Sequence, residues 1–205
     1  GRLTRAFSLA NPPSRATEVE LNVRLVPGGE GTTWIHTQLA EGDRIRLSGP
    51  YGRFFVRKSA PGDLIFMAGG SGLSSPRSMI LDLLEKGDRR NMTLIYGQRR
   101  RDELYYHEEF VELARRHSNF RYVPALSEEP TESAWEGFRG FVHEAAKAAF
   151  GGDFRGHKAY LCGPPKMIEA CIATLMQGRL YERDIYTEKF ISAADAQGTR
   201  SPLFK

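Results

Sequence analysis

The sequence predicts an antiparallel β-barrel region over residues 1–57, followed by an α/β doubly wound parallel sheet over residues 58–190. Short stretches of alternating apolar and polar residues come first, and longer cycles of strand and helix periodicity follow them. The turn-rich stretch at residues 59–62 separates the two regions. A polar C-terminal tail, residues 191–205, has no assigned role.

The alternation in the first region is typical of antiparallel strands with one face covered by a core. The residues that show it are Val19, Leu21, Val23 and Leu25, and then Ile45 and Leu47. One short helical pattern, residues 33–39, interrupts the strands just after the glycine-rich run at 28–31. We therefore expect a barrel-like region with a single short helix.

The second region repeats a cycle of buried strand and amphipathic helix. The expected strands cover residues 63–70, 92–97, 120–126 and 158–163. The expected helices cover residues 75–87, 105–117, 141–150 and 164–178. Their inward faces include Met79, Ile80, Leu83 and Leu84 in the first helix, and Met167, Ile168, Cys171, Ile172 and Leu175 in the last. Such cycles indicate a parallel sheet covered by helices on both faces.

Composition excludes several classes of function. The net charge of +4 is small and its basic residues are scattered, which argues against a nucleic-acid surface. Cys162 and Cys171 are spaced for neither a zinc site nor a disulfide framework, which is typical of a reducing cytoplasm. No apolar run approaches the roughly 20 residues that cross a bilayer. We expect a soluble, cytoplasmic protein that binds neither nucleic acid nor a membrane.

A glycine-rich turn, residues 69–72, joins the first buried strand to its helix, and Pro76 falls in the first turn of that helix. Free backbone N–H groups at the positive end of a helix dipole suit an anion, here a dinucleotide. The Ser71 hydroxyl is placed to reach a nicotinamide carboxamide. The run differs from the G-x-G-x-x-G fingerprint, and a tight strand-to-helix turn needs glycine in any case, so a purely structural role stays open.

Two further strands end in candidate binding residues, at 96–99 and at 162–165. Ligands of open α/β sheets bind outside the carboxyl ends of the strands, so the three strand ends outline one crevice. Cys162 is either a small buried apolar residue or a soft side chain beside the nicotinamide C4. No histidine is placed to activate it as a nucleophile.

The stretch Arg5-Ala6-Phe7-Ser8 has a phosphate-binding guanidinium and an aromatic ring on one face of an extended chain. A ring there can cover a flat ring system, and Ser8 can offer a hydroxyl. The alternative is an edge strand with one core phenylalanine and one solvated arginine.

In this order, seven motifs resemble the ferredoxin-NADP reductase superfamily: R-A-F-S, V-R-L-V-P-G-G-E-G-T-T, G-P-Y-G, G-G-S-G-L-S-S-P, Y-G-Q-R, C-G-P-P-K-M and T-E-K-F. Within the superfamily, the chain most resembles the reductase component of bacterial multicomponent phenol hydroxylases. Reductases of toluene and related monooxygenases come next.

The resemblance implies a site for FAD. The expected FAD-binding residues are Arg5, Ala6, Phe7, Ser8, Val23, Arg24, Leu25, Gly31, Thr32 and Phe190. Arg5 would pair with the pyrophosphate, Phe7 would stack on the isoalloxazine where many members have Tyr, and Ser8 would hydrogen-bond near flavin N5. Glu30 places an unfavourable charge near the phosphates. Phe190 would cover the opposite flavin face as a gate, and core packing is its alternative role.

The resemblance also implies a site for NADH. The expected NADH-binding residues are Gly70, Ser71, Gly72, Tyr96, Arg99, Cys162, Gly163, Pro164 and Met167. The glycine turn would hold the pyrophosphate and the nicotinamide end, and Tyr96 and Arg99 the adenosine side. Ser8, Cys162 and Glu188 are the expected catalytic residues, and no metal ligands are expected. The arginines at 99–101 could bind a 2′-phosphate, so the choice between NADH and NADPH stays open.

The implied reaction passes a hydride from NADH to FAD, and then single electrons to an iron-sulfur centre and an oxygenase component. In the superfamily the Arg-x-Phe/Tyr-Ser strand lies inside the flavin barrel, so we expect earlier strands and a [2Fe-2S] domain to precede this N-terminally incomplete barrel. Two cysteines cannot supply the four ligands of that cluster. The alternatives are a stand-alone ferredoxin or flavin reductase, a non-catalytic nucleotide-binding fragment, and a Rossmann dehydrogenase, which would not explain Arg5, Phe7 and Phe190.

Overall fold

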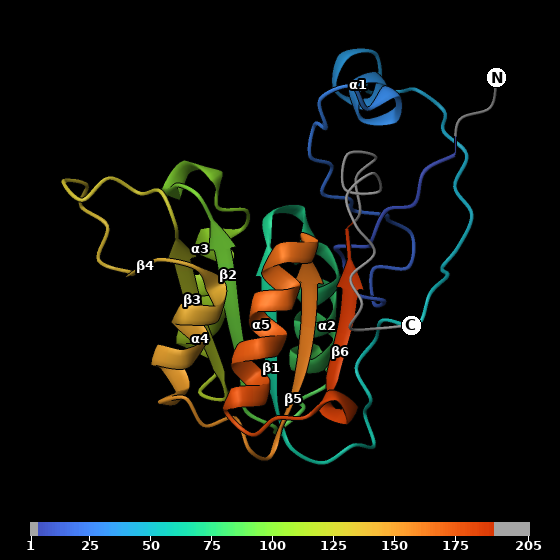
Figure 1. The fold of residues 1–205 in the computed structure, drawn as a ribbon. Coiled ribbons are helices and arrows are strands. Elements are labelled where there is room, and N and C mark those ends of the chain that lie inside the picture. The colour runs from blue at the N-terminus through green and yellow to red at the C-terminus, as the bar shows by residue number, and fades with distance from the viewer. Residues whose placement is uncertain (1–3, 191–205) are drawn as a thin grey trace.

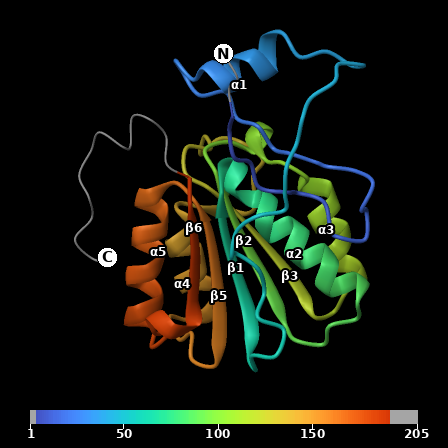
Figure 2. The same ribbon diagram turned by 90° about the vertical axis from the view of Figure 1, so that its right-hand side faces the viewer.

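The computed structural model describes residues 4–190. The larger, C-terminal part of these residues forms a three-layer α/β unit with a six-stranded parallel sheet in the middle (Figures 1 and 2). The strands are β1 Asp63–Gly69, β2 Met92–Gln98, β3 Phe120–Leu126, β4 Phe138–Arg139, β5 His157–Gly163 and β6 Ile185–Lys189. Their order in the sheet is β4-β3-β2-β1-β5-β6, and every neighbouring pair is parallel.

Helices cover both faces of this sheet. They are α2 Ser74–Glu85, α3 His107–Arg116, α4 Val142–Phe150 and α5 Pro165–Gln177. Successive residues of β1 point to opposite faces, so Leu64 and Phe66 pack with α2 and α3, whereas Ile65 and Met67 pack with α4 and α5. The doubly wound sheet predicted from the sequence is therefore confirmed, and the predicted inward faces of α2 and α5 are buried or packed against these two cores.

The chain order reverses at β1, which has β2 on one side and β5 on the other. Such a switch point leaves a crevice at the carboxyl ends of the two diverging strands. β1 ends at Gly69 and β5 at Gly163, so both glycine-containing motifs lie at this crevice. The short strand β4 has only two residues and was not expected.

Residues 4–62 contain one helix, α1 Glu30–Thr37, close to the helix expected at 33–39. They contain no strand, and their one β-bridge joins Leu9 to Leu21 in the antiparallel sense. Alternation sets which side chains share a face, but a strand also needs a hydrogen-bonded neighbour, and these segments have none beyond that bridge. The complete antiparallel barrel stays a prediction.

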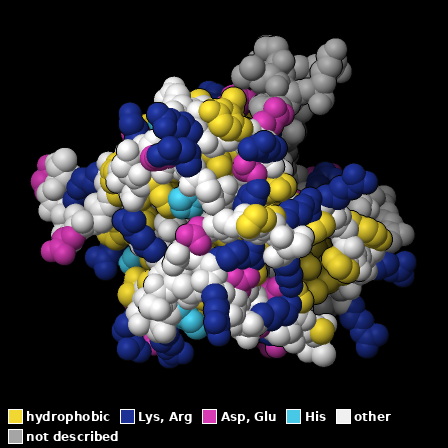
Figure 3. Space-filling model, turned by 90° about the horizontal axis from the view of Figure 1, so that it is seen from below, with side chains coloured by type: hydrophobic (Ala, Val, Ile, Leu, Met, Phe, Trp, Pro, Cys, Tyr) yellow, Lys and Arg dark blue, Asp and Glu magenta, His cyan; other side chains and the backbone are white. Residues whose placement is uncertain are grey.

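The division at residues 57 and 58 also stays a prediction, and the tail at 191–205 lies outside the described residues. Between residues 4 and 190, no helix has the length and apolar character needed to cross a membrane. In the face seen in Figure 3, Lys and Arg side chains are spread over the whole view with acidic side chains between them, without a continuous basic stripe.

Candidate active site

Four side chains from separate segments meet at the carboxyl edge of the sheet. Glu188 of β6 accepts hydrogen bonds on Oε2 from Ser8 Oγ at 2.9 Å and from Ser75 Oγ at 3.0 Å. Cys162 Sγ lies 3.6 Å from the same oxygen. The structure thus brings together the three expected catalytic residues, although Ser8 and Glu188 are 180 positions apart. Sequence analysis missed Ser75, because nothing local links a helix residue to a strand 113 positions away.

Strand register explains why these groups meet. Cys162 lies directly beside Ala68 of β1 and beside Glu188 of β6. Side chains at paired positions of parallel strands point to the same face of the sheet. Ser75 reaches this face from the first turn of α2, which follows directly from the end of β1. Only Ser8 comes from the N-terminal segment, so its meeting with Glu188 depends on how that segment is held.

Cys162 is fully buried, and this burial, reinforced by the Glu188 carboxylate, raises the pKa of its thiol. The thiol therefore stays protonated near neutral pH and is not a nucleophile. It is a neutral, polarisable group at the crevice, which agrees with both interpretations offered by the sequence.

We expect both cysteines to be unreactive in the folded protein. Burial also raises the pKa of Cys171, to about 12, and neither cysteine is in a disulfide. Mixed at pH 8 with a thiol-reactive disulfide dye, the native protein should release almost no chromophore, and the protein in denaturant should react at both thiols. Rapid reaction of Cys162 in the native protein would contradict its assignment as a protonated, enclosed thiol.

The turn after β1 has glycines for two different reasons. Gly70 has φ +56°, in the left-handed region, and a Cβ there would meet open space. A Cβ on Gly72 would lie 2.4 Å from the carbonyl oxygen of Cys162, so the turn passes directly over the end of β5. A Cβ on Gly69 would lie 2.5 Å from Met167 Sδ. The open side at Gly70 lets a ligand approach the backbone closely, while the other two glycines allow tight packing.

Tyr96 hydrogen-bonds to the glycine turn from within the core. Its side chain is fully buried, and its hydroxyl donates to Gly70 O at 3.3 Å and accepts from Gln98 Nε2 at 2.7 Å. Burial raises the pKa of Tyr96, so the phenol is neutral. Sequence analysis placed Tyr96 on the adenosine side. Since its ring has no exposed surface, any part that it takes in binding acts through the turn.

Beyond the ends of β2 and β3, the arginines at 99–101 meet carboxylates. Arg99 Nη2 donates to Glu103 Oε1 at 2.6 Å, and the Arg101 backbone N–H donates to Glu129 Oε2 at 2.9 Å. An open cavity of about 500 Å³ lies here. Its lining residues are Arg100, Arg101, Asp102, His107, Glu108, Glu129 and Pro130. Glu103 is close to Arg99 in the sequence, whereas Glu129 is brought near Arg101 by the pairing of β2 with β3.

The expected flavin-contacting residues of the N-terminal region are partly accessible. Arg5 is exposed, and Phe7 keeps 36% of its surface exposed beside Ser8. Ala6, Arg24 and Leu25 are exposed, and Val23 is half-buried. Gly31 is buried in the first turn of α1, and the Thr32 hydroxyl is bonded to Gly29 O and Val26 N within the turn before that helix. Thr32 thus shapes this turn, and its hydroxyl already has two partners.

The expected gate residue and the glycine-proline motif of β5 lie together. The Phe190 backbone N–H donates to Gly163 O at 3.0 Å, and the Phe190 side chain is half-buried. Pro164 is exposed at the start of α5, and Ser71 is half-buried in the glycine turn. The expected nicotinamide-binding residues therefore border the same crevice as Glu188. No cluster of three or more potential metal ligands occurs in the part of the chain that the structure describes.

The comparisons with known proteins agree with this geometry. Residues 66–172 match the oxidoreductase NAD-binding domain family, and residues 1–56 match the oxidoreductase FAD-binding domain family. The chain is 67% identical over 204 residues to the phenol 2-monooxygenase reductase component DmpP of Pseudomonas sp. (strain CF600), and 59% identical to the phenol hydroxylase P5 protein of Acinetobacter pittii (strain PHEA-2). Both matches cover 98% of this chain and 58% of the relative.

Solved structures show the same fold. The crystal structure of the Amycolatopsis cytochrome P450 reductase GcoB superposes with a TM-score of 0.81 at 35% sequence identity, over 90% of this chain and 55% of that one. The sheet, the glycine turn and the two family matches together identify the chain: it belongs to the oxidoreductases of the ferredoxin reductase family, which combine an FAD-binding with an NAD-binding domain.

Proposed function

We propose that this chain is the FAD- and NADH-binding part of the reductase component of a phenol-type multicomponent monooxygenase, located in the cytoplasm. Electrons would pass from NADH through FAD to an iron-sulfur centre of the whole protein, and then to the oxygenase component. The observation that carries the electron-transfer function is the meeting of Ser8, Cys162 and Glu188 at the switch point of the sheet. The 67% identity to a phenol 2-monooxygenase reductase component supports the oxygenase partner.

The residues of the N-terminal region fit a flavin dinucleotide. An exposed guanidinium and an exposed aromatic ring, Arg5 and Phe7, precede a hydroxyl held by a carboxylate, Ser8 on Glu188. These groups can pair with a phosphate and cover a flat ring, and the Ser8 hydroxyl, whose one proton goes to Glu188 here, would turn to donate it to a ring nitrogen when the flavin binds. The first turn of α1, with Gly31 and Thr32, adds backbone N–H groups for the pyrophosphate. We place the boundary between the FAD- and NADH-binding parts at residues 57 and 58.

When bound, FAD supplies the redox chemistry, accepting a hydride and releasing electrons one at a time. The protein supplies position and a proton path. Ser8 Oγ and Glu188 Oε2 form a hydrogen-bonded pair 2.9 Å apart that can hold or move a proton, and Glu188 is only half-buried, so water can exchange that proton. The neutral, buried thiol of Cys162 fills the space beside Glu188, with Sγ 3.6 Å from Oε2.

On the opposite side of the crevice, the turn at Gly70, Ser71 and Gly72 would hold the pyrophosphate and nicotinamide end of NADH. The Gly70 backbone is open to a ligand, and Gly163 and Pro164 border the same space. Phe190 follows β6 at the mouth of the crevice, where its ring would have to tilt for the nicotinamide to reach the flavin. Met167 supports the turn through its contact with Gly69.

Glu103 is expected to disfavour NADPH. It neutralises Arg99 across a 2.6 Å ion pair, so the guanidinium is not free for a 2′-phosphate. In Glu103→Gln, which keeps the side-chain shape, we expect the affinity for 2′,5′-ADP to rise about tenfold and the affinity for ADP to stay unchanged. Isothermal titration with both nucleotides measures this, and Glu112→Gln, which loses an arginine pair on α3, is the control. Equal changes for both nucleotides would contradict the assignment.

The proposed partner is tested with the full-length reductase and the purified oxygenase component. We expect phenol to be hydroxylated only when NADH, both proteins and oxygen are present, with consumption of NADH coupled to consumption of phenol. NADH oxidation that never supports phenol consumption, although free FAD and artificial acceptors are reduced, would favour a stand-alone reductase.

A further inference from the structure

Arg77 is a charged side chain in an unusual place. It lies on α2, next to the glycine turn, and only 3% of its surface is exposed. Its guanidinium donates to both carboxylate oxygens of Glu109 on α3, at 2.6 and 2.9 Å. It also lies over the ring of Tyr106, with Cζ 3.9 Å from the ring centre. Neither the function described above nor the sequence motifs explain why this arginine is buried.

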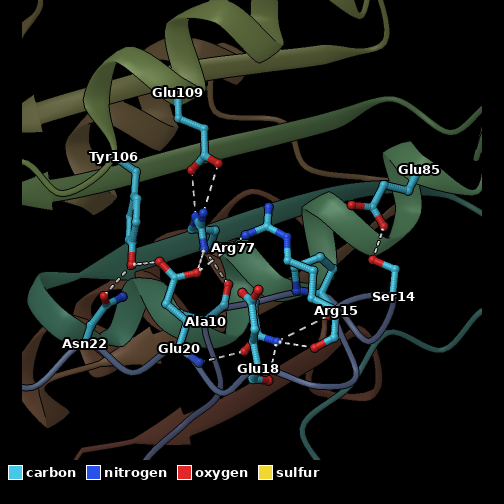
Figure 4. Close-up of polar contacts among 12 residues, drawn as sticks. Ala10, Ser14, Arg15, Glu18, Glu20, Asn22, Arg77, Glu85, Tyr106 and Glu109 are labelled. Atoms are coloured by element: carbon cyan, nitrogen blue, oxygen red, sulfur yellow. Dashed lines mark hydrogen bonds and ion pairs between the residues drawn. The ribbon is translucent and has the colours of Figure 1, made fainter. Parts of the chain in front are cut away.

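The other side of the same guanidinium holds the N-terminal loop, residues 8–22. Nη1 donates to Ala10 O at 2.8 Å and to Glu20 Oε2 at 2.9 Å, so Arg77 lies between Glu109 and the two ends of this loop (Figure 4). Glu20 in turn accepts from the Tyr106 hydroxyl, at 2.7 Å on Oε1. We call Arg77, Glu20, Tyr106 and Glu109 the Arg77 cluster.

The N-terminal loop is closed on itself by its own hydrogen bonds. The Ala10 backbone N–H donates to Glu20 O at 2.8 Å, and Leu9 and Leu21 form the antiparallel bridge. Inside the loop, the buried Asn11 side chain donates to Glu18 O and accepts from the Glu20 backbone N–H. Because Arg77 holds Ala10 and Glu20, it also fixes the position of Ser8, which directly precedes the bridge between Leu9 and Leu21.

A second contact in the cluster fixes the same loop to α2 and α3. The Tyr106 hydroxyl lies equally close, at 2.7 Å, to Asn22 Oδ1 and shares its one proton between this oxygen and Glu20 Oε1, and Asn22 Nδ2 donates to Ser74 Oγ at 3.0 Å. Tyr106 has φ +53°, a left-handed conformation that is rare for residues other than glycine. With this backbone conformation just before α3, the Tyr106 ring lies against Arg77 and the Tyr106 hydroxyl reaches the N-terminal loop.

We infer that Arg77 is a positioning residue, which holds the N-terminal loop on α2 and α3 so that the Ser8 hydroxyl reaches Glu188. The inference rests on the proposed function for the meaning of the contact between Ser8 and Glu188, but the position of the loop can be measured without it. The hydrogen bonds of the Arg77 side chain go to Glu109, Ala10 and Glu20, which are not among the residues assigned to FAD or NADH, and Ala10 is two positions from Ser8.

Hydrogen exchange measures the position of the loop directly. In Arg77→Met of the full-length protein, we expect the amides of residues 8–22 to lose protection about tenfold and those of β1 to keep theirs. The control is Arg115→Met, which removes an exposed arginine paired with Glu112 on α3 and should change neither segment. If Arg77→Met does not fold, Glu20→Gln and Tyr106→Phe break the cluster from its other members. Unchanged protection of residues 8–22 in all folded variants would overturn the inference.

Coupling to Ser8 separates positioning from a general structural role. We expect Ser8→Ala to slow flavin reduction by NADH about tenfold in the otherwise unchanged protein, but less than about twofold when Arg77→Met is already present. Fully additive effects would show that Arg77 does not act through Ser8 and would overturn the inference. If Ser8→Ala has no effect by itself, the proposed role of Ser8 fails, and the exchange experiment alone decides whether Arg77 holds the loop.

Discussion

Replacing Glu188 with glutamine is expected to slow the reduction of bound FAD by NADH about a hundredfold, the size of loss that follows when one preorganised hydrogen-bonding group at a reaction centre is removed. Glu188 Oε2 is the point where two serine hydroxyls and a thiol converge. An amide removes the negative charge that these donors share, and its oxygen accepts a weaker hydrogen bond from Ser8. An amide nitrogen at the position of Oε2 would also face three donors.

The rate is measured by stopped-flow absorbance after anaerobic mixing with NADH. The matched control is Glu169→Gln, the same substitution at an exposed glutamate of α5 that lies 3.7 Å from Lys189 at the end of β6. We expect this control to react at the unchanged rate. A Glu188→Gln protein that is also reduced at the unchanged rate would show that the convergence at Oε2 is structural.

Replacing Gly72 with alanine is expected to destabilise the protein by about 3 kcal/mol, as overpacking at a rigid site does. The new Cβ would lie 2.4 Å from Cys162 O, 2.7 Å from Cys162 C and 2.7 Å from the Gly163 Cα. All three are backbone atoms of β5, so no side chain can rotate away. The turn must shift off the sheet, and the affinity for NAD⁺ should fall with it.

Urea denaturation and NAD⁺ titration measure the two effects. Gly87→Ala is the control: Gly87 has φ +68° with open space around it, so this change should cost about 1 kcal/mol through backbone strain alone and leave NAD⁺ binding unaffected. A Gly72→Ala protein within about 0.5 kcal/mol of the unchanged one would contradict the close approach of turn and strand.

The α/β unit could be predicted from the sequence because its signals are local. The buried strand β1 is an almost continuous apolar run, and the strand predicted at 120–126 is observed with the predicted bounds. The helix after the glycine turn has Pro76 in its first turn and ends just before Gly87, as these start and stop signals predict. Two-residue β4 gives no periodic signal and was missed.

The site was only partly predictable, because its contacts are not local. Ser8, Cys162 and Glu188 were named from motifs, and the sheet register then placed Cys162 beside Glu188. Ser75 lies within the quoted motif G-G-S-G-L-S-S-P but had no predicted role, Glu129 belongs to no motif, and both reach their places through tertiary contacts. Arg77 shows this limit most clearly. An arginine within an amphipathic helix is expected to be solvated, and only the structure shows that it is buried and paired with the carboxylates of Glu20 and Glu109.

The measurement that tests the central claim most directly is the visible spectrum of the protein after reconstitution with FAD and desalting, before and after anaerobic addition of NADH. We predict that the flavin bands survive desalting and bleach when NADH is added, for this chain and for the full-length reductase alike. If neither protein retained flavin, or if retained flavin did not bleach with NADH, the assignment of Arg5, Phe7, Ser8 and Glu188 to a hydride-transfer site would be wrong.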